Sequence, residues 1–411
     1  MFRATRRVAV LGLLLLGLAA TDATSPAGRW DAVVTIVDGT EIPFRFDIDS
    51  SGGAWKGSFF DGDKRISSKP GAFKDGVLNL PFKQYAMTLQ VTLTNGQLEG
   101  TYLRGSFPSY KFRATRHVAA PPVAASEVPK IAGVWKVSGF DTKKNKGEQA
   151  WRLIVRQSGP DVSAAMLRID GDTGTMTGSF RDGKFVISHF SGARPSLFEI
   201  APGADGTLDL LQNKKVKLAG LRIDDPRAKE SPNPTNALDH TRWKDANERF
   251  RFSFNDLNGK PITDSDPKLQ GKVLLVSITG SWCPNCRDEA PFLASLYKKY
   301  RGRGFEIVAL SFEEADQFAN PTRLRAFIKE YGIEYTVLLA GDPDKLAEAL
   351  PGAENLNSFP TSFLIGRDGK VRAVHAGFPS PASGAFYTEA QRDLTTQVER
   401  LLAERPAGTQ E

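Results

Sequence analysis

Cysteine is scarce in this chain: Cys283 and Cys286 are the only two among 411 residues. A scaffold held together by several disulfides is therefore excluded. Histidine is rare as well, and the four histidines are scattered along the sequence. A structural zinc site combines four Cys or His ligands at close spacing, so we expect no metal site, and nothing in the sequence indicates another cofactor. The histidines in question are His117, His189, His240 and His375.

Positive charge and long apolar runs are limited too. The formal net charge is +7, and no dense Lys/Arg run with interleaved aromatic residues occurs, which argues against a nucleic-acid partner. The apolar run at residues 8–20 is shorter than the roughly 20 residues of a spanning helix. It follows Arg3, Arg6 and Arg7 and precedes small residues, as in a secretory signal peptide. We expect residues 1–23 to be this signal and the protein to be exported, to the periplasm or the outer face of the cytoplasmic membrane. An uncleaved anchor is the alternative.

Two β modules are expected after the signal, at residues 27–118 and 130–224. Short alternating apolar runs bounded by Asp-Gly and Asn-Gly pairs predict antiparallel hairpins. "AGRWDAVV" is echoed by "AGVWKVSG", and "WKGSFFDGDKRI" by "MTGSFRDGKFVI", which indicates a duplicated domain with a period of roughly 105 residues. Each module is expected to be an antiparallel sandwich or barrel, and one fused β structure remains possible. Their tryptophans (Trp30, Trp55, Trp135 and Trp151) are expected in the cores; a ligand-stacking platform is the alternative.

A polar linker is predicted at residues 225–247, and an α/β domain at residues 248–404. In this last region, apolar runs such as "KVLLVSITG" and "FEIVALSF" alternate with helical segments such as "RDEAPFLASLYKKY". Polar linkers and a complete set of elements predict that this domain folds independently.

Both cysteines fall between a buried strand and the helix that follows it. Free N–H groups and the helix dipole should stabilise the thiolate of Cys283 there, and Cys286 lies one turn further on, within reach of a mixed disulfide. We expect Cys283 to be the accessible thiol. A purely structural disulfide is the alternative, although so short a loop gains little stability from one.

Glu289 lies on the same helical stripe as Cys286, because spacings of three and four connect it to Leu293 and Leu296. It is therefore expected beside the cysteines in a partly apolar site, with a raised pKa, where it can act as general base and acid. An exposed, ion-paired glutamate is the alternative.

The sequence "SWCPNC", the step "FPT" at residues 359–361, and "CRDEAP" resemble the TlpA/ResA-like thiol-disulfide oxidoreductases of the redoxin superfamily. The resemblance covers residues 248–404 and implies a thioredoxin fold. It implies that Cys283 attacks, that Cys286 resolves and that Glu289 occupies the family's glutamate position. It further implies client proteins with disulfides or thiols, apocytochromes c among them, and an upstream membrane electron donor. The residues it places beside a substrate are Trp282, Phe359, a cis Pro360 and Thr361.

Three functional questions stay open. In this family proline most often precedes the second cysteine, whereas here Pro284 follows the first cysteine and Asn285 precedes the second. This departure leaves the direction of the reaction open, with reduction preferred over oxidation. A redoxin-type peroxidase would have a Thr three residues before its cysteine, where Gly280 stands. Alternatively, the β modules recognise an envelope ligand or partner and the redox domain is accessory.

Overall fold

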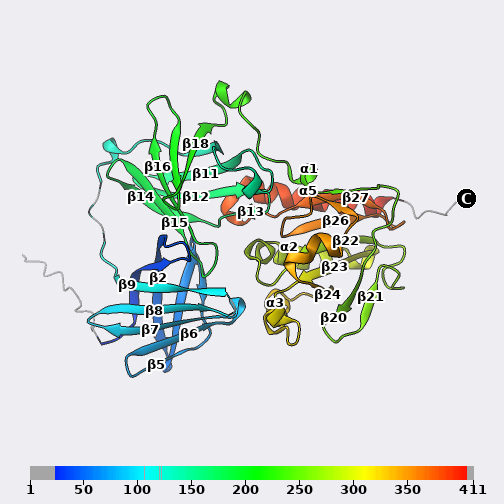
Figure 1. The fold of residues 1–411 in the computed structure, drawn as a ribbon, viewed down its shortest axis with the longest axis horizontal. Coiled ribbons are helices and arrows are strands. Elements are labelled where there is room, and N and C mark those ends of the chain that lie inside the picture. Colours follow the sequence, from blue (N-terminus) through cyan, green and yellow to red (C-terminus); the bar gives the residue numbers. More distant parts are fainter. Residues whose placement is uncertain (1–23, 106, 120, 122, 405–411) are drawn as a thin grey trace, which may run out of the picture.

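The computed structural model describes residues 24–404 except 106, 120 and 122, and these form three parts (Figure 1). The predicted signal peptide at residues 1–23 lies outside the described residues. Within the described part, no helix is long and apolar enough to cross a membrane. Two β units stand on one side of the molecule, and the mixed α/β domain stands on the other.

The first β unit is one nine-stranded antiparallel sheet in the order β4-β3-β2-β1-β9-β8-β7-β6-β5. The sheet curls into a half-barrel whose two edge strands, β4 and β5, do not pair. Its elements are β1 (Gly28–Thr35), β2 (Glu41–Ser51), β3 (Ala54–Asp61), β4 (Lys64–Ser67), β5 (Ala72–Lys74), β6 (Val77–Phe82), the 3-10 helix η1 (Lys83–Tyr85), β7 (Met87–Thr94), β8 (Gln97–Arg104) and β9 (Phe107–Arg116).

The second β unit is a closed barrel. Its strands follow the order β11-β10-β18-β17-β16-β15-β14-β12-β13, and an additional pairing of β11 with β12 closes the ring. Closure removes the exposed edges that an open sheet would leave. The strands are β10 (Gly133–Ser138), β11 (Trp151–Ser158), β12 (Asp161–Arg168), β13 (Gly171–Asp172), β14 (Met176–Arg181), β15 (Lys184–His189), β16 (Ser196–Pro202), β17 (Leu208–Gln212) and β18 (Val216–Arg222).

The half-barrel is completed by a side chain from the second unit. Phe190, which follows β15, is 1% exposed and packs into the first core, 4.9 Å from the ring of Phe44 and 5.2 Å from that of Phe59. The two units thus share part of a core while keeping separate sheets, so they do not form one continuous β-sheet. Trp30, Trp135 and Trp151 are buried in these cores, which confirms their expected place. Trp55 packs against the first core while partly buried.

The C-terminal domain has a seven-stranded mixed sheet in the order β21-β20-β24-β23-β22-β26-β27. The three central strands β24, β23 and β22 are parallel, and β26 runs antiparallel to β22. Its strands are β20 (Ser253–Asp256), β21 (Pro261–Thr263), β22 (Val273–Thr279), β23 (Phe305–Phe312), β24 (Thr336–Gly341), β26 (Thr361–Ile365) and β27 (Val371–Ala376). Its helices are α2 (Pro284–Tyr300), α3 (Thr322–Tyr331), α4 (Leu346–Ala349) and α5 (Ala385–Ala403). This alternation confirms the α/β prediction.

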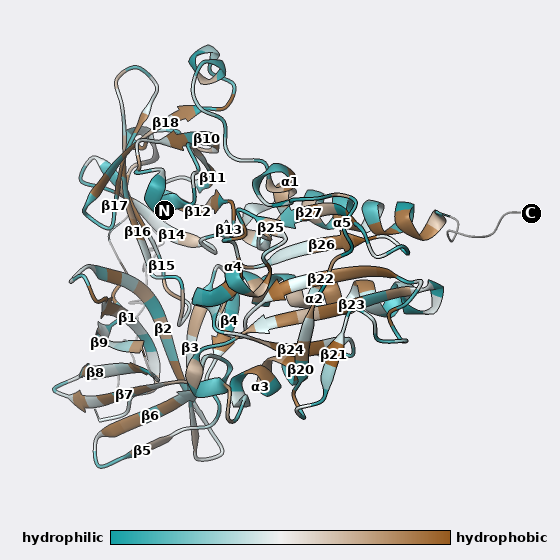
Figure 2. Ribbon diagram, turned by 45° about the vertical axis from the view of Figure 1, so that its right-hand side comes forward, coloured by the Kyte–Doolittle hydropathy of each residue, from teal (hydrophilic) through white to brown (hydrophobic). Residues whose placement is uncertain are grey.

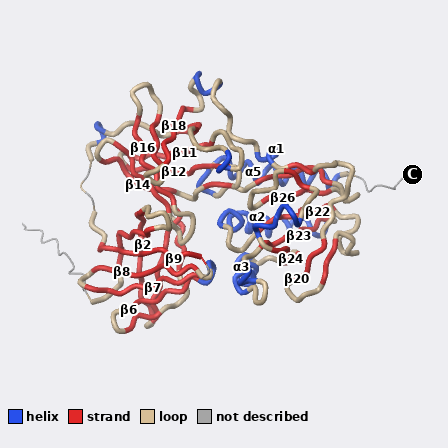
Figure 3. The backbone as a smooth tube through the Cα atoms, viewed as in Figure 1, coloured by secondary structure: helices blue, strands red, loops and turns tan. Residues whose placement is uncertain are grey.

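Both faces of this sheet are buried, which explains its continuous apolar runs. Every residue of β22 and β23 is buried, and both strands are largely brown in Figure 2. One core lies between the sheet and helices α2, α3 and α5, and the other contains α4 and the segment around Phe250. Figure 3 shows the contrast between the domain with long helices and the two β units, which consist mainly of strands.

The segment predicted as a linker, residues 225–247, is structured in both halves, and its first half contains the 3-10 helix η4 (Pro226–Lys229). Helix α1 (Ala237–His240) is followed by β19 (Arg242–Trp243), which pairs with β25 (Ala353–Glu354). The Trp243 ring packs 4.9 Å from Phe250 and so joins the second core of the C-terminal domain. Because most of the segment is polar, its composition did not indicate that Trp243 would pack into a core.

Candidate functional site

The two cysteines lie where β22 ends and α2 begins. Cys283 is the N-cap of α2, and its sulfur accepts a hydrogen bond from the backbone N–H of Cys286 at 3.2 Å. Both are free thiols. The free N–H groups at a helix start stabilise a thiolate at the N-cap position, so the geometry suits Cys283 to nucleophilic attack.

Cys283 is less accessible than expected. Its side chain is 3% exposed, and that of Cys286 is 1% exposed. The thiol of Cys283 lies 3.6 Å from the carbonyl oxygen of Phe359. The expectation of an accessible thiol is therefore wrong for this conformation, in which the neighbouring loop and the second β unit both lie against the motif.

A turn of the second β unit contacts the motif directly. The side chain of Asn285, between the two cysteines, donates to the carbonyl of Asp170 at 2.7 Å. A Cβ atom added to Gly171 would lie 2.4 Å from the carbonyl oxygen of Phe378, and one added to Gly377 would lie 1.9 Å from that of Ile169. The turn between β12 and β13 is thus fitted against backbone on both sides, and larger residues have no room there.

The four residues predicted to contact substrate gather beside Cys283. The Phe359–Pro360 peptide bond is cis, as the resemblance implied. The indole of Trp282 donates to the carbonyl of Phe312 at 2.8 Å and meets the Phe359 ring edge-on at 5.1 Å. Thr361 is fully buried and donates to the Ser358 carbonyl, so its side chain holds the loop and does not face a substrate.

Glu289 is buried beneath the cysteines, as predicted. It is 2% exposed and accepts hydrogen bonds from Ser277 at 3.2 Å and Ser362 at 3.1 Å. Burial raises the pKa of Glu289 to about 7, and the two hydrogen bonds from hydroxyl groups offset part of this rise. Burial also raises the pKa of Cys286, and the nearby Cys283 and Glu289 add to that rise. A carboxyl group titrating near neutrality beside a thiol is suited to proton transfer.

A buried ion pair below the motif was not predicted. Glu313 is fully buried and accepts from the backbone N–H of Ser281 at 2.7 Å and from its hydroxyl at 2.6 Å. Arg323 of α3 donates to the same carboxylate at 2.8 Å and also pairs with Glu314. This network fixes the loop that precedes Cys283. Its signal in the sequence is the Glu-Glu pair directly after the apolar run at residues 305–312.

Charged residues after Cys286 bind the β units. Arg194, in the loop between β15 and β16, forms an ion pair with Asp288, and Arg287 donates to the carbonyl of Gln84. Asp172 accepts from the backbone N–H and hydroxyl of Ser380, both at 2.7 Å. These contacts are buried or partly buried, so the β units are held against the active-site helix by polar groups.

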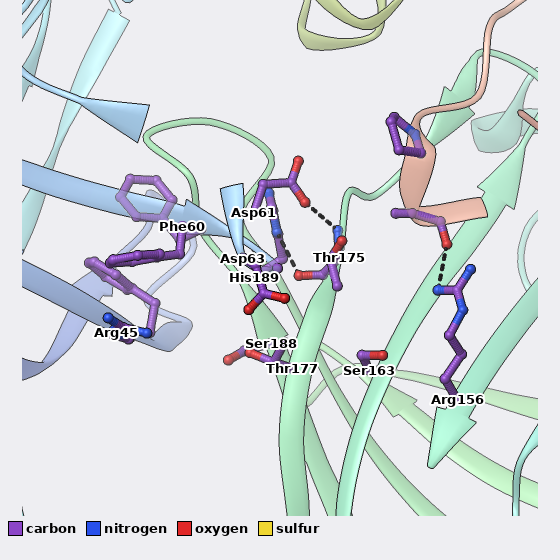
Figure 4. Close-up of a pocket in the computed structure, with 15 residues that line it drawn as sticks. Arg45, Phe60, Asp61, Asp63, Arg156, Ser163, Thr175, Thr177, Ser188 and His189 are labelled. Atoms are coloured by element: carbon purple, nitrogen blue, oxygen red, sulfur yellow. Dashed lines mark hydrogen bonds between the residues drawn. The ribbon is translucent and has the colours of Figure 1, made fainter. Parts of the chain in front are cut away.

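A cavity of about 450 Å³ lies where the three parts meet (Figure 4). Asp61 of the first unit accepts from the Thr175 N–H of the second at 2.7 Å, and Arg156 donates to the carbonyl of Ala382 at 3.0 Å. No cysteine lines this cavity. Over the described part of the chain, no group of three or more His, Cys, Asp or Glu residues is placed to hold a metal ion.

Comparisons with known proteins find similarity in the C-terminal domain. The AhpC/TSA family model matches residues 246–374. The thiol-disulfide oxidoreductase ResA of Bacillus thuringiensis (strain Al Hakam) is 35% identical over 133 residues, which are 32% of this chain and 70% of that protein. ResA of Bacillus subtilis (strain 168) is 36% identical over 126 residues, which are 31% of this chain and 64% of that protein.

Among solved structures, a thiol:disulfide interchange protein of the thioredoxin family from Chlorobium tepidum TLS is 26% identical, with a TM-score of 0.29. The match covers 42% of this chain and 99% of that one. The match to the first of these ResA proteins extends over more than two thirds of that protein but over only 32% of this chain. Through its C-terminal, thioredoxin-like domain, this chain belongs to the ResA-type thiol-disulfide oxidoreductases.

Proposed function

We propose that the protein is an exported thiol-disulfide oxidoreductase that reduces disulfides of envelope client proteins, apocytochromes c among them. Cys283 attacks one sulfur of the client disulfide, which forms a mixed disulfide and releases the first client thiolate. Cys286 then attacks the sulfur of Cys283, which forms the Cys283–Cys286 disulfide and releases the second client thiolate. Two electrons pass to the client, and an upstream membrane donor restores the dithiol.

The observation that carries this proposal is the hydrogen bond from the Cys286 N–H to the Cys283 sulfur at the start of α2. It brings the resolving residue to the attacking one and favours negative charge on Cys283. Trp282, Phe359 and Pro360 form the wall against which a client chain would lie. Reduction is the proposed direction because the resemblance to ResA-like proteins favours it.

Glu289 is proposed as the proton acceptor for Cys286. The burial that raises the pKa of the Cys286 thiol makes its unassisted ionisation unfavourable. Glu289, whose pKa is raised to about 7, accepts the proton when Cys286 attacks and returns it when the dithiol is restored. Ser277 and Ser362 hold the carboxylate in place during both steps.

The test is a pair of cysteine variants in the full-length protein. Cys286→Ser should accumulate mixed disulfides with envelope proteins, which mass spectrometry can identify after non-reducing electrophoresis. Cys283→Ser is the matched control and should trap none. The wild-type protein should reduce a peptide disulfide with an electron donor present. Equal trapping by both variants, or no reduction of any disulfide, would contradict the proposal.

Export is proposed from the leader at residues 1–23, with a mature chain that starts near residues 21–24. Fractionation of cells followed by N-terminal sequencing tests it. An intact N-terminus in the cytosolic fraction would refute export, and an intact N-terminus in the membrane fraction would indicate the uncleaved anchor.

The cysteine variants also distinguish two other functions. A redoxin-type peroxidase would consume hydrogen peroxide with Cys283 alone, so Cys286→Ser would keep the first turnover. A binding protein with an accessory redox domain would retain an envelope partner when both cysteines are replaced by serine. Mixed disulfides that depend on Cys283 favour the oxidoreductase over both.

We also propose that the two β units arose by duplication, and equivalent contacts support this. The Trp30 indole donates to the carbonyl of Pro26 at 2.9 Å, and that of Trp135 donates to the carbonyl of Ile131 at 2.9 Å. A guanidinium covers each indole, Arg116 at 4.0 Å and Arg222 at 4.7 Å. Superposition of residues 28–116 on 133–222 should bring these pairs together; a strand register that separates them would contradict duplication.

A further inference from the structure

A cavity of about 560 Å³ lies between the first β unit and the active-site helix. Its walls come from β4, from η1, from α3, from the loop that carries Arg194 in the second β unit and from the beginning of α2, where Pro284 and Arg287 contribute. Pro284 stands directly after Cys283. The cavity therefore borders the residue that follows the attacking cysteine, on the side of the first β unit, which nothing in the sequence connected with the redox site.

Positive charge dominates this cavity. Seven cationic side chains and three carboxylates line it. Two of the carboxylates are already bound, Asp288 by Arg194 and Glu330 by Arg287. The whole chain has a net charge of only +7, so more than half of its excess is concentrated here.

Four lysines produce this excess. Three belong to the first β unit and one to α3, and within the described part of the structure none of them forms an ion pair. Their side chains are exposed. Gathering like charges without partners destabilises a fold slightly, and it also attracts ligands of the opposite sign. We call this site the lysine cavity, and its four lysines are Lys64, Lys69, Lys83 and Lys329.

We propose that the lysine cavity binds an acidic segment of the client polypeptide, rich in Asp or Glu and close in sequence to the disulfide that Cys283 attacks. The proposal rests on the function proposed above and names its substrate class. An extended chain advances about 3.3–3.6 Å per residue, so residues only a few positions from the client cysteine reach the cavity when its sulfur meets Cys283.

A client segment fits this site better than a membrane surface does. The lysines line a hollow between two parts of the protein, whereas a lipid surface is broad and needs cations that project from one flat face. The volume also falls within the roughly 300–1,000 Å³ of pockets that enclose small ligands, which is enough for a few side chains.

The first experiment measures binding without chemistry. A fluorescent, cysteine-free peptide containing four glutamates is titrated with the full-length protein and followed by anisotropy, beside a peptide with four glutamines. The glutamate peptide should bind at least about tenfold more tightly at low salt, and the difference should shrink at 0.5 M NaCl because exposed charges are screened. Equal binding of the two peptides would overturn the proposal whatever the redox activity.

The second experiment compares two quadruple variants that change net charge equally. Lys64→Gln, Lys69→Gln, Lys83→Gln and Lys329→Gln together should abolish the preference for the glutamate peptide. The control replaces four exposed lysines that do not line the cavity (Lys111, Lys144, Lys229 and Lys345) and should keep it. Similar melting temperatures confirm that both variants fold. If the control variant also loses the preference, the effect comes from the overall charge of the protein, and the proposed site is wrong.

The third experiment links the cavity to catalysis. Two peptide disulfides that differ only in flanking Glu or Gln residues serve as substrates, and kcat/KM should favour the acidic one in wild type but not in the cavity variant. If acidic peptides bind but no disulfide is reduced, the oxidoreductase function fails while the cavity stands. Binding to phosphatidylglycerol vesicles that requires the four lysines, without any peptide preference, would assign the cavity to a membrane surface and overturn the proposal.

Discussion

Asn285, which lies between the two cysteines, donates a hydrogen bond to the carbonyl of Asp170 in the second β unit at 2.7 Å. The redox motif is therefore in direct contact with a module 115 residues away in the sequence. Because this turn lies against the motif, we expect it to limit the access of a disulfide to Cys283.

Weakening the turn should expose Cys283. Asp172 anchors the turn through Ser380 and Ser383, and Asp172→Ala removes all of these hydrogen bonds without changing the motif. Each 1.4 kcal/mol of lost docking free energy raises the open population about tenfold. We expect iodoacetamide to alkylate Cys283 at least several-fold faster, as measured by mass spectrometry.

The control for this variant is Asp161→Ala, at the exposed beginning of the same strand β12. It should leave the alkylation rate unchanged. An unchanged rate in Asp172→Ala, with a native circular dichroism spectrum, would show that the turn does not limit access.

Glu289→Gln should slow the second chemical step and spare the first. Glutamine keeps the size of the side chain but cannot accept a proton from Cys286. Release of the client from the mixed disulfide should fall by about 10²-fold near pH 7, the lower end of the range typical of general acid–base catalysis. Stopped-flow exchange with a peptide disulfide between pH 5 and 9 measures both steps, and coincident pH profiles for the two proteins would remove Glu289 from the mechanism.

The same substitution should change how stability depends on pH. The pKa of Glu289 is raised by burial from 4.5 to about 7 in the folded protein, so the folded state holds this proton more tightly than the unfolded state does. The stability linked to it is complete below pH 4.5 and is lost as the pH rises through 7. At 1.36 kcal/mol per pKa unit the loss is roughly 3 kcal/mol.

Glu289→Gln lacks this titration. The free energy of unfolding of the variant, relative to wild type, should therefore increase between pH 4.5 and 7 and stay level above that range. Urea unfolding at pH 4.5, 6 and 8 measures the difference. A constant difference across the three pH values would mean that Glu289 titrates normally.

Phe190 should hold the two β units together. Phe190→Ala removes a 1% exposed ring from the core of the half-barrel, and truncation of a buried Phe costs about 3–5 kcal/mol. Phe107→Ala, at a ring that is 38% exposed, is the matched control and should cost far less. Chemical denaturation followed by fluorescence compares them, and equal losses would show that Phe190 is not a joint between the units.

The sequence predicted what depends on local spacing and could not predict what depends on docking. Cys283, Cys286 and Glu289 were placed correctly because a helical repeat of three and four residues puts them together whatever surrounds the helix. The pair formed by Arg194 and Asp288 joins residues from different parts, each an ordinary surface charge in its own segment. These residues become buried only when one part packs on another, and no periodicity in either segment indicates that packing.

The C-terminal domain should fold without the β units. Every buried residue of its two cores lies between Phe250 and Leu401, and no side chain of either β unit belongs to them. The groups that removal of residues 24–230 would expose at the interface, such as Arg287 and Asp288, are charged and regain water. The truncated protein should therefore unfold cooperatively, with Cys283 alkylated faster than in the full chain. It should also reduce glutamate-flanked and glutamine-flanked disulfides equally, because Lys64, Lys69 and Lys83 are gone.

A truncated domain that aggregates would show that the interface is structural. One that folds but keeps Cys283 protected would show that the loop of Phe359, and not the β units, covers the thiol.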